Sequence, residues 1–296
     1  MGASVARQAV EQGRKVALLL RPTSDTSRIT DLLDKVAVIY GDLGNIDQAR
    51  NALAAFGPET VAHLAWGGVK GSDRNSPAQV ANIIASVALY RVATELGCRR
   101  FVGLGSQAEY GPCPARTNES VPTQPTTVYG AAKLSTFWLL DRMAAADGNS
   151  FGWLRLFSCY GPGDDPSWLI PYMTLRLLAG EKPALTKGDQ MWDYIYVDDA
   201  AAAVISLIDS DAAGAFNLGS GQAYRLRDIV TIIRDLIDPA LPLGIGEIPY
   251  RPDQVMHLEA DITALTRATA WTPNMPLDQG LQLTVDWYRS KIQGNA

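Results

Sequence analysis

The chain has 296 residues, of which 47% are hydrophobic, 26 are basic and 31 are acidic, with a formal net charge of −5. This length suffices for one large domain or two intimate ones, and the small acidic excess without a basic stripe argues against nucleic acid as a partner. Three scattered cysteines and two histidines offer no metal-ligand spacing, the apolar runs are too short for a membrane span, and no signal peptide is visible, so we expect a cytoplasmic protein with neither metal nor membrane.

Short apolar runs alternate with helical patterns through the first half of the chain. We expect strands at 15–20, 35–40, 60–65, 100–104 and 151–156, with long helices at 77–96 and 127–146. Continuous apolar strands that alternate with helices predict a parallel sheet covered on both faces. The predicted fold is α/β, doubly wound and Rossmann-like, with ligands at the carboxyl ends of the strands. We assign residues 1–162 to this doubly wound domain.

The pattern loosens after residue 162, where proline becomes frequent. Helices are expected at 198–210, 226–237 and 277–292, and residues 215–218 are expected to return to the main sheet as a strand. We therefore expect residues 163–296 to form mainly a smaller substrate-binding region that is interleaved with the first domain, to which 190–220 returns.

Three side chains around the second long helix form a candidate proton-transfer set. Ser106 follows a predicted buried strand, and Tyr129 precedes Lys133 by one helical turn, so both lie on one helix face. A nearby ammonium favours the phenolate form of tyrosine, which can then exchange a proton with a substrate oxygen held by the serine. Taken alone, the same spacing also fits an amphipathic helix start with a solvated lysine.

Further motifs follow one another along nearly the whole chain. They are Gly-Asp-Leu at 41–43, His-Leu-Ala at 63–65, Asn82, Ser106 with Tyr-Gly at 110–111, the Tyr129/Lys133 pair, Arg-Leu-Phe-Ser at 155–158, Tyr-Gly-Pro-Gly at 160–163, Asp-Tyr-Ile-Tyr-Val-Asp at 193–198, Asn-Leu-Gly-Ser-Gly at 217–221 and Arg-Pro-Asp at 251–253. In this order and spacing they resemble the extended short-chain dehydrogenase/reductase family, in its NAD-dependent epimerase/dehydratase group acting on nucleotide sugars.

The resemblance implies a catalytic set of Ser106, Tyr129 and Lys133 and two groups of binding residues. The cofactor residues would be Gly2, Arg21, Asp42, Leu43, Ala65, Trp66, Asn82, Tyr129, Lys133 and Leu156. The substrate residues would be Ser106, Gln107, Ser158, Trp168, Trp192 and Arg251. In isolation Asp42 could simply cap a helix and Asn82 could be an ordinary mid-helix polar residue. The resemblance also implies a homodimer through the two long helices.

The cofactor end departs from the family pattern at two places. Arg21 ends a predicted strand where NAD-specific members usually carry an acidic residue for the ribose hydroxyl, and a cation there favours NADP(H), although it could be a surface arginine before Pro22. Gly2 matches the last glycine of the phosphate-binding motif, so the first strand and the first two glycines are missing. A truncated chain or a degenerate protein would explain this, and we expect weak cofactor binding.

Other departures bear on the reaction. Gln107 and Ala108 stand where dehydratases carry an acid pair, which disfavours water elimination. Trp192 and Trp168 replace an arginine and an amide that many members direct at the nucleotide, and Ser158 replaces a frequent asparagine. We expect an NAD(P)-dependent epimerase or ketoreductase of a nucleotide-linked sugar. The alternatives are a reductase of a non-nucleotide carbonyl compound and a non-catalytic Rossmann-fold binding or regulatory protein.

Overall fold

A parallel four-stranded sheet forms the centre of the molecule. The computed structural model describes residues 1–113, 115–252 and 254–294. The strand order is β10-β5-β4-β3, formed by Gly214–Leu218, Ser150–Leu156, Arg100–Ser106 and Thr60–His63. Register places Phe101 opposite both Val61 and Phe151, so apolar side chains of neighbouring strands stack in rows. The α/β fold predicted from the sequence is confirmed.

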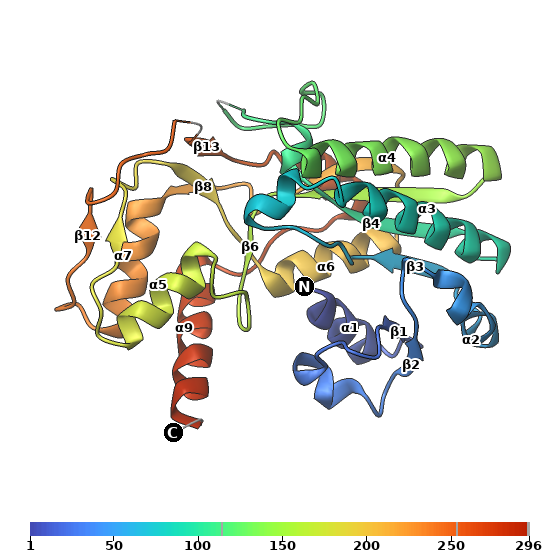
Figure 1. Cartoon of the computed structure of the whole chain (residues 1–296), viewed down its shortest axis with the longest axis horizontal. Coiled ribbons are helices and arrows are strands. Elements are labelled where there is room, and N and C mark those ends of the chain that lie inside the picture. Colours follow the sequence, from blue (N-terminus) through green and yellow to red (C-terminus); the bar gives the residue numbers. More distant parts are fainter. Residues whose placement is uncertain (114, 253, 295–296) are drawn as a thin grey trace.

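A second sheet contains only β1 (Ala17–Leu20) and β2 (Ala37–Tyr40), which pair in parallel. Within the described ranges, no strand hydrogen-bonds to both β1 and β3, so the parallel strands form two separate pieces. The two pieces are nevertheless joined through side chains, because Ala17 and Leu19 of β1 pack into the same apolar cluster as Phe101 of β4. Figure 1 shows β1 and β2 beside β3.

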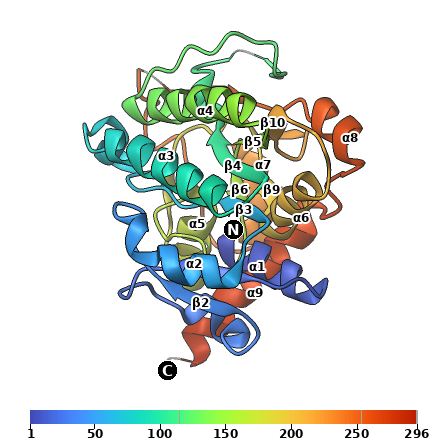
Figure 2. The same ribbon diagram turned by 90° about the vertical axis from the view of Figure 1, so that its right-hand side faces the viewer.

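Helices cover both faces of the four-stranded sheet. On one face α3 (Gln79–Glu95) and α4 (Val128–Asp147) lie side by side, as Figure 2 shows, and Leu140 and Phe137 of α4 pack on Phe151 and Trp153. On the other face, the elements are α1 (Gly2–Glu11), α6 (Val197–Ile208) and α8 (Thr263–Thr269). Short elements near β1 and β2 are the 3-10 helices η1 (Ser27–Leu32) and η2 (Ile46–Ala49) and the helix α2 (Arg50–Phe56).

The second half of the chain adds a smaller unit at one end of the sheet (Figure 1). Its helices are α5 (Leu169–Leu178), α7 (Leu226–Ile237) and α9 (Leu277–Gly294), which share an apolar cluster around Met173, Ile229 and Leu281. Its short strands are β6 (Cys159–Tyr160), β7 (Ala184–Leu185), β8 (Met191–Asp193), β9 (Ile195–Tyr196), β11 (Ala223–Arg225), β12 (Gly244–Ile245) and β13 (His257–Leu258). Between these short strands the chain re-enters the main sheet as β10.

One buried carboxylate ties this smaller unit together. Asp193 is 0% exposed and accepts hydrogen bonds from the backbone nitrogens of Ser220, Gly221 and Ala260, and from the Ser220 hydroxyl. A carboxylate that accepts hydrogen bonds from distant segments fixes irregular backbone that forms no regular β-sheet or helical hydrogen bonds. Asp193 therefore holds the 217–221 turn against the segment around Ala260.

Of the described helices, none is long and apolar enough to cross a membrane.

Candidate active site

The start of α4 is docked against the end of β4. The Thr127 hydroxyl caps α4 by accepting from the Gly130 nitrogen at 3.0 Å. The helix approaches so closely that a Cβ on Gly130 would overlap the carbonyl oxygen of Ala108. Tyr129 and Lys133, which are 7% and 3% exposed, therefore point from the buried side of α4 toward the end of β4.

Ser106 lies at that strand end and begins the 3-10 helix η4 (Gln107–Glu109) with a capping box. Its hydroxyl accepts from the Ala108 nitrogen at 3.2 Å, and Glu109 Oε1 accepts from the Ser106 nitrogen at 2.9 Å. Glu109 is 0% exposed and also accepts from Trp153 Nε1 at 2.9 Å and Arg155 Nε at 2.8 Å. The carboxylate of Glu109 thus binds the Ser106 backbone, Trp153 and Arg155 together.

Lys133 is buried beside Trp66. Its Nζ donates to the carbonyl oxygen of Leu104 at 2.5 Å and lies 3.8 Å from the centre of the Trp66 ring. Burial lowers the pKa of Lys133 from 10.5 to about 7, although the charge of Glu109 acts in the opposite direction. The ammonium therefore exchanges its proton near neutral pH.

Tyr129 lies between two cations. The Arg74 guanidinium carbon is 4.4 Å from the centre of the Tyr129 ring, and Lys133 Nζ is 6.0 Å from it. Burial raises the pKa of Tyr129, whereas a hydrogen bond with Ser106 and the charge of Arg74 lower it. Trp66 approaches the same ring edge-on, with the ring centres 6.3 Å apart. The structure therefore brings Ser106, Tyr129 and Lys133 into one buried corner.

An amide pair shapes the loop that carries Trp66. Gln79, which is 2% exposed, accepts from Trp66 Nε1 at 2.8 Å and donates to Gly68 and Asp73 carbonyl oxygens. Asn82 accepts from the Gly67 nitrogen at 3.0 Å. Our sequence analysis named Asn82 but missed Gln79 and Arg74. The amide at the start of an apolar helix was a signal for Gln79, whereas no pattern marked Arg74.

The residues expected near the adenosine end lie at exposed strand ends. Arg21 follows β1, and Asp42 follows β2, where its Oδ1 accepts from the Gly44 nitrogen at 2.7 Å. Leu43 is partly buried, and Gly2 is exposed at the first position of α1. Arg21, Asp42 and Ala65 thus lie just beyond the carboxyl ends of parallel strands, Leu156 ends β5, and Gly2 instead begins a helix.

The residues expected to bind substrate are spread more loosely. Trp192 on β8 donates from Nε1 to the Ser158 hydroxyl at 2.8 Å. Trp168 precedes α5 with 43% of its surface exposed, Arg251 is exposed, and Gln107 is partly buried. Asp253 of the Arg-Pro-Asp motif lies outside the described residues.

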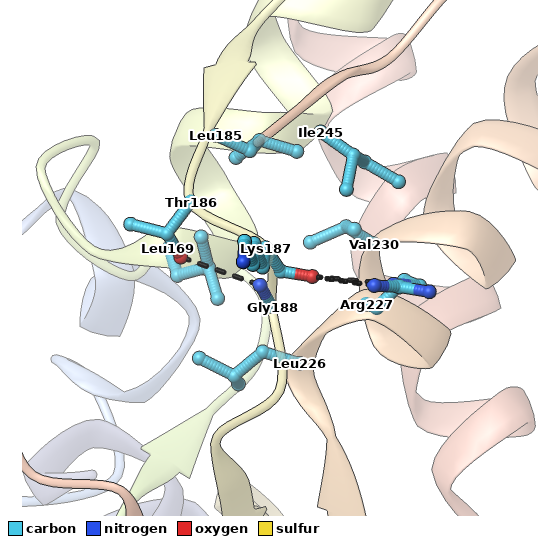
Figure 3. A pocket seen from close by; sticks show the side chains of 9 residues that line it. All are labelled: Leu169, Leu185, Thr186, Lys187, Gly188, Leu226, Arg227, Val230 and Ile245. Carbon is cyan, nitrogen blue, oxygen red and sulfur yellow. Dashed lines mark hydrogen bonds between the residues drawn. The ribbon is translucent and has the colours of Figure 1, made fainter. Parts of the chain in front are cut away.

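A small pocket lies away from this corner. It lies between β7, α7 and β12, as Figure 3 shows, and is lined by Leu169, Leu185, Thr186, Lys187, Gly188, Leu226, Arg227, Val230 and Ile245. None of the three catalytic candidates lines it.

Over the described ranges, no cluster of His, Cys, Asp or Glu side chains is arranged to hold a metal ion.

Comparison with known proteins identifies the family. The profile of the family described as "NAD dependent epimerase/dehydratase family" matches residues 1–219. A dTDP-glucose 4,6-dehydratase of Shigella flexneri is 26% identical over 289 residues, which cover 86% of this chain and 79% of that protein.

Two solved structures are similar over almost the whole chain. The UDP-glucose 4-epimerase of Thermotoga maritima, solved with UDP-glucose, has a TM-score of 0.88 and 25% identity, with 98% of this chain and 96% of that chain covered. MoeE5, solved with UDP-glucose and NAD, has a TM-score of 0.82 and 25% identity over the same shares of the two chains. The profile match spans well over half of the sequence, and the chain therefore belongs to the NAD dependent epimerase/dehydratase family.

Proposed function

We propose that this chain is an NAD(P)-dependent epimerase or ketoreductase that acts on a nucleotide-linked sugar. The observation that carries the proposal is the meeting of Ser106, Tyr129 and Lys133 in one buried corner at the end of β4. The relatives that bind UDP-glucose or act on dTDP-glucose support a nucleotide sugar as the substrate class.

The residues present fit a dinucleotide along the strand ends. Lys133 and Tyr129 would hold the nicotinamide end, and the exposed Arg21 and Asp42 would flank the adenosine end. The dinucleotide, when bound, supplies the hydride acceptor and donor. Because Arg21 offers a cation for a 2′-phosphate, we favour NADP(H) over NAD(H).

The protein groups move the proton. In the oxidative direction, the Tyr129 phenolate takes the proton of the substrate hydroxyl while the Ser106 hydroxyl donates a hydrogen bond to the same oxygen. In the reductive direction, Tyr129 returns that proton to the carbonyl oxygen. Lys133 stabilises the phenolate when it carries its own proton, which the depressed pKa makes sensitive to pH near 7.

Epimerisation or ketone reduction is favoured over water elimination. Elimination needs an acid beside the reacting sugar, and Gln107 and Ala108 cannot provide one. The nearest carboxylic acid in the sequence, Glu109, is 0% exposed and bound to Arg155, Trp153 and the Ser106 backbone. These three donors hold the buried Glu109 side chain as a structural group, so we do not assign it the role of the acid.

A second candidate is the reduction of a carbonyl compound without a nucleotide. The hydrogen bond between Trp192 and Ser158 favours it, because it occupies both side chains at positions where relatives place groups for the sugar nucleotide. A binding protein without activity is a third reading, against which the buried Ser106, Tyr129 and Lys133 argue.

We also propose a homodimer through α3 and α4. Large apolar side chains are exposed on these helices: Val80, Ile84, Val128, Trp138 and Leu139. Several large exposed apolar side chains on two neighbouring helices are consistent with a subunit interface. Sedimentation at micromolar concentration should give the dimer mass, and Trp138→Glu should shift it to the monomer; a wild-type monomer at that concentration would contradict the proposal.

The direct test is turnover of a substrate panel. The protein is incubated with NAD(H) or NADP(H) and with UDP- and dTDP-linked hexoses, and products are identified by proton NMR while absorbance at the nicotinamide band is followed. Conversion of a nucleotide hexose to its C4 epimer or 4-keto form supports the proposal. Conversion of simple ketones alone selects the second candidate, and no conversion with measurable cofactor binding selects the binding protein.

A further inference from the structure

Arg74 is the cation closest to the catalytic tyrosine, although no sequence motif indicated a role for it. It lies in the 3-10 helix η3 (Gly71–Asn75), in the loop between β3 and α3. Its guanidinium carbon stacks 4.4 Å from the centre of the Tyr129 ring. Lys133, to which the family pattern assigns the cationic role, is farther from the ring at 6.0 Å and donates to the Leu104 carbonyl instead.

Two independent contacts fix the position of Arg74. The side-chain oxygen of its neighbour Asn75 accepts from the Val128 nitrogen at 3.1 Å, which docks η3 on the first residue of α4. From the other side, the buried Gln79 amide donates to the Asp73 carbonyl at 3.0 Å. These bonds hold the residues on both sides of Arg74 and aim its side chain at the start of α4.

The guanidinium is not neutralised by an acid. Arg74 is in none of the ion pairs found within the part of the chain that the structure describes, and the hydrogen bond found there for its side chain is to the Val69 carbonyl oxygen at 3.4 Å. A half-buried arginine without a carboxylate keeps its full charge for the ring on which it stacks. The other charged groups that face Tyr129 are Lys133, on α4 itself, and Glu109, from η4.

We propose that Arg74 is a positioning residue that fixes the Tyr129 ring and stabilises its phenolate form. Arg74 and Lys133 would then stabilise the phenolate in different ways. Lys133 is fully buried and loses its proton near neutral pH, whereas an arginine stays charged throughout the working range. Arg74 thus supplies the constant part of the field at Tyr129, and Lys133 the part that varies with pH. The inference rests on the proposed role of Tyr129 as proton donor and acceptor.

Carbon-13 NMR of tyrosine labelled at Cζ tests this role without turnover. The Tyr129 resonance is identified by its loss in Tyr129→Phe, and its titration midpoint is compared among the wild type, Arg74→Met and Arg74→Lys. We expect the midpoint to lie at higher pH in Arg74→Met and close to the wild type in Arg74→Lys. Asn75→Leu, which undocks η3 and keeps the charge, should move the midpoint in the same direction by a smaller amount.

Arg176→Met is the matched control, because Arg176 stacks on Tyr172 at 5.7 Å on the exposed surface of α5. It should leave the Tyr129 midpoint unchanged. An unchanged midpoint in Arg74→Met, in a protein that melts like the wild type, would overturn the inference.

Kinetics with the substrate found in the panel give a second readout. In Arg74→Met the acid limb of the kcat profile should move to higher pH, with kcat at pH 7 reduced roughly tenfold, the effect of one unit in the ionisation of the base. A rise in KM alone, with the acid limb in place, would instead make Arg74 a substrate contact and overturn the positioning role. If no sugar nucleotide is converted by the wild type, the proposed function fails, and the NMR titration still decides the role of Arg74.

Discussion

The two sides of the proposed site are built in different ways. Around Ser106 and Tyr129, the side chains are buried and hydrogen-bonded, and Glu109 accepts from three donors. On the proposed substrate side, the side chains of Trp168, Trp192 and Arg251 are exposed or partly exposed. Trp192 donates a hydrogen bond to the hydroxyl of Ser158 on this side.

This difference indicates which residues can be substituted without loss of folding. Buried, cross-linked groups hold one geometry, and losing one partner leaves others unsatisfied. Exposed aromatic side chains can be replaced at small cost to folding. Under the proposed function, the chemistry would therefore depend on the corner at the end of β4, and the choice of substrate on side chains that the fold does not need.

The largest effect is expected at the reacting phenol. Tyr129→Phe removes the group that exchanges the proton and keeps the ring on which Arg74 stacks. We expect kcat to fall by about 10³-fold, within the range for loss of general acid–base catalysis. Steady-state assays and a cofactor-binding titration check this, and Tyr90→Phe, which removes a hydroxyl bound to Asp147, is the control. Turnover that persists in Tyr129→Phe would break the proposed mechanism.

The next effect tests the rigidity of the corner. Glu109→Gln leaves Arg155 as a buried charge without its carboxylate, so the free energy of unfolding should fall by about 3 kcal/mol. Glu95→Gln breaks the half-exposed pair with Arg50, which solvent screens, and should lower the free energy of unfolding much less. Urea unfolding measures both variants. Equal losses would show that the corner is no more tightly built than the surface.

A third prediction concerns the cost of the catalytic lysine. Burial lowers the pKa of Lys133 from 10.5 to about 7, so between these values the unfolded chain holds a proton that the folded chain does not. Stability should therefore rise with pH across this window, and Lys133→Met should remove that contribution to the slope. At pH 7, Lys133→Met should stabilise the protein by about 1–3 kcal/mol.

Thermal melts at pH 7 and pH 10 measure this effect, with Lys35→Met, an exposed lysine, as the control. A Lys133→Met protein that melts below the wild type at pH 7 would mean that the contacts with Leu104 and Trp66 outweigh the cost of burying the ammonium.

A fourth prediction concerns the cofactor. Arg21→Ala should weaken NADP(H) binding by about 1–3 kcal/mol and leave NAD(H) nearly unchanged, because only NADP(H) carries the phosphate that a cation there would bind. Fluorescence titration of both reduced cofactors measures the difference, and Arg91→Ala, on the exposed surface of α3, is the control. Equal loss for both cofactors would remove Arg21 from the adenosine site.

The smallest effect is expected on the exposed side. Trp192→Phe removes the hydrogen bond to Ser158 and keeps an aromatic ring, so KM for the sugar nucleotide should change by about 3- to 10-fold at nearly constant kcat. A fall in kcat without a change in KM would show that this side also serves the chemistry, and the contrast between the two sides would fail.

Much of the fold could be predicted because apolar runs mark buried strands and helices directly. The helix predicted at 226–237 is α7, and those at 77–96 and 127–146 differ from α3 and α4 by one or two residues at their ends. The strand expected at 60–65 ends at His63, since Ala65 and Trp66 already belong to the loop over the site.

The proximity of the three residues proposed as the catalytic set was predictable for a different reason. Ser106, Tyr129 and Lys133 are tied to regular elements, so spacing along the chain translates into position. Arg74 and Gln79 belong to a loop whose path is set by hydrogen bonds between side chains and backbone, and such bonds leave no periodic pattern. The loss of solvent around Lys133, which shifts its pKa, depends on Trp66 and distant packing and could not be inferred from spacing either.

The separation between β1 and β3 has a consequence for the behaviour of the protein in solution. Among the described strands, each of the two pairs along one edge only, and all four residues of β1 are partly exposed, whereas Phe101 and Val102 of β4 are 2% and 0% exposed. Unpaired strand edges recruit other extended chains. Amide hydrogens of β1 and β3 should therefore exchange with deuterium faster than those of β4, and precipitation on warming should begin from these strands while the β4 corner is still folded.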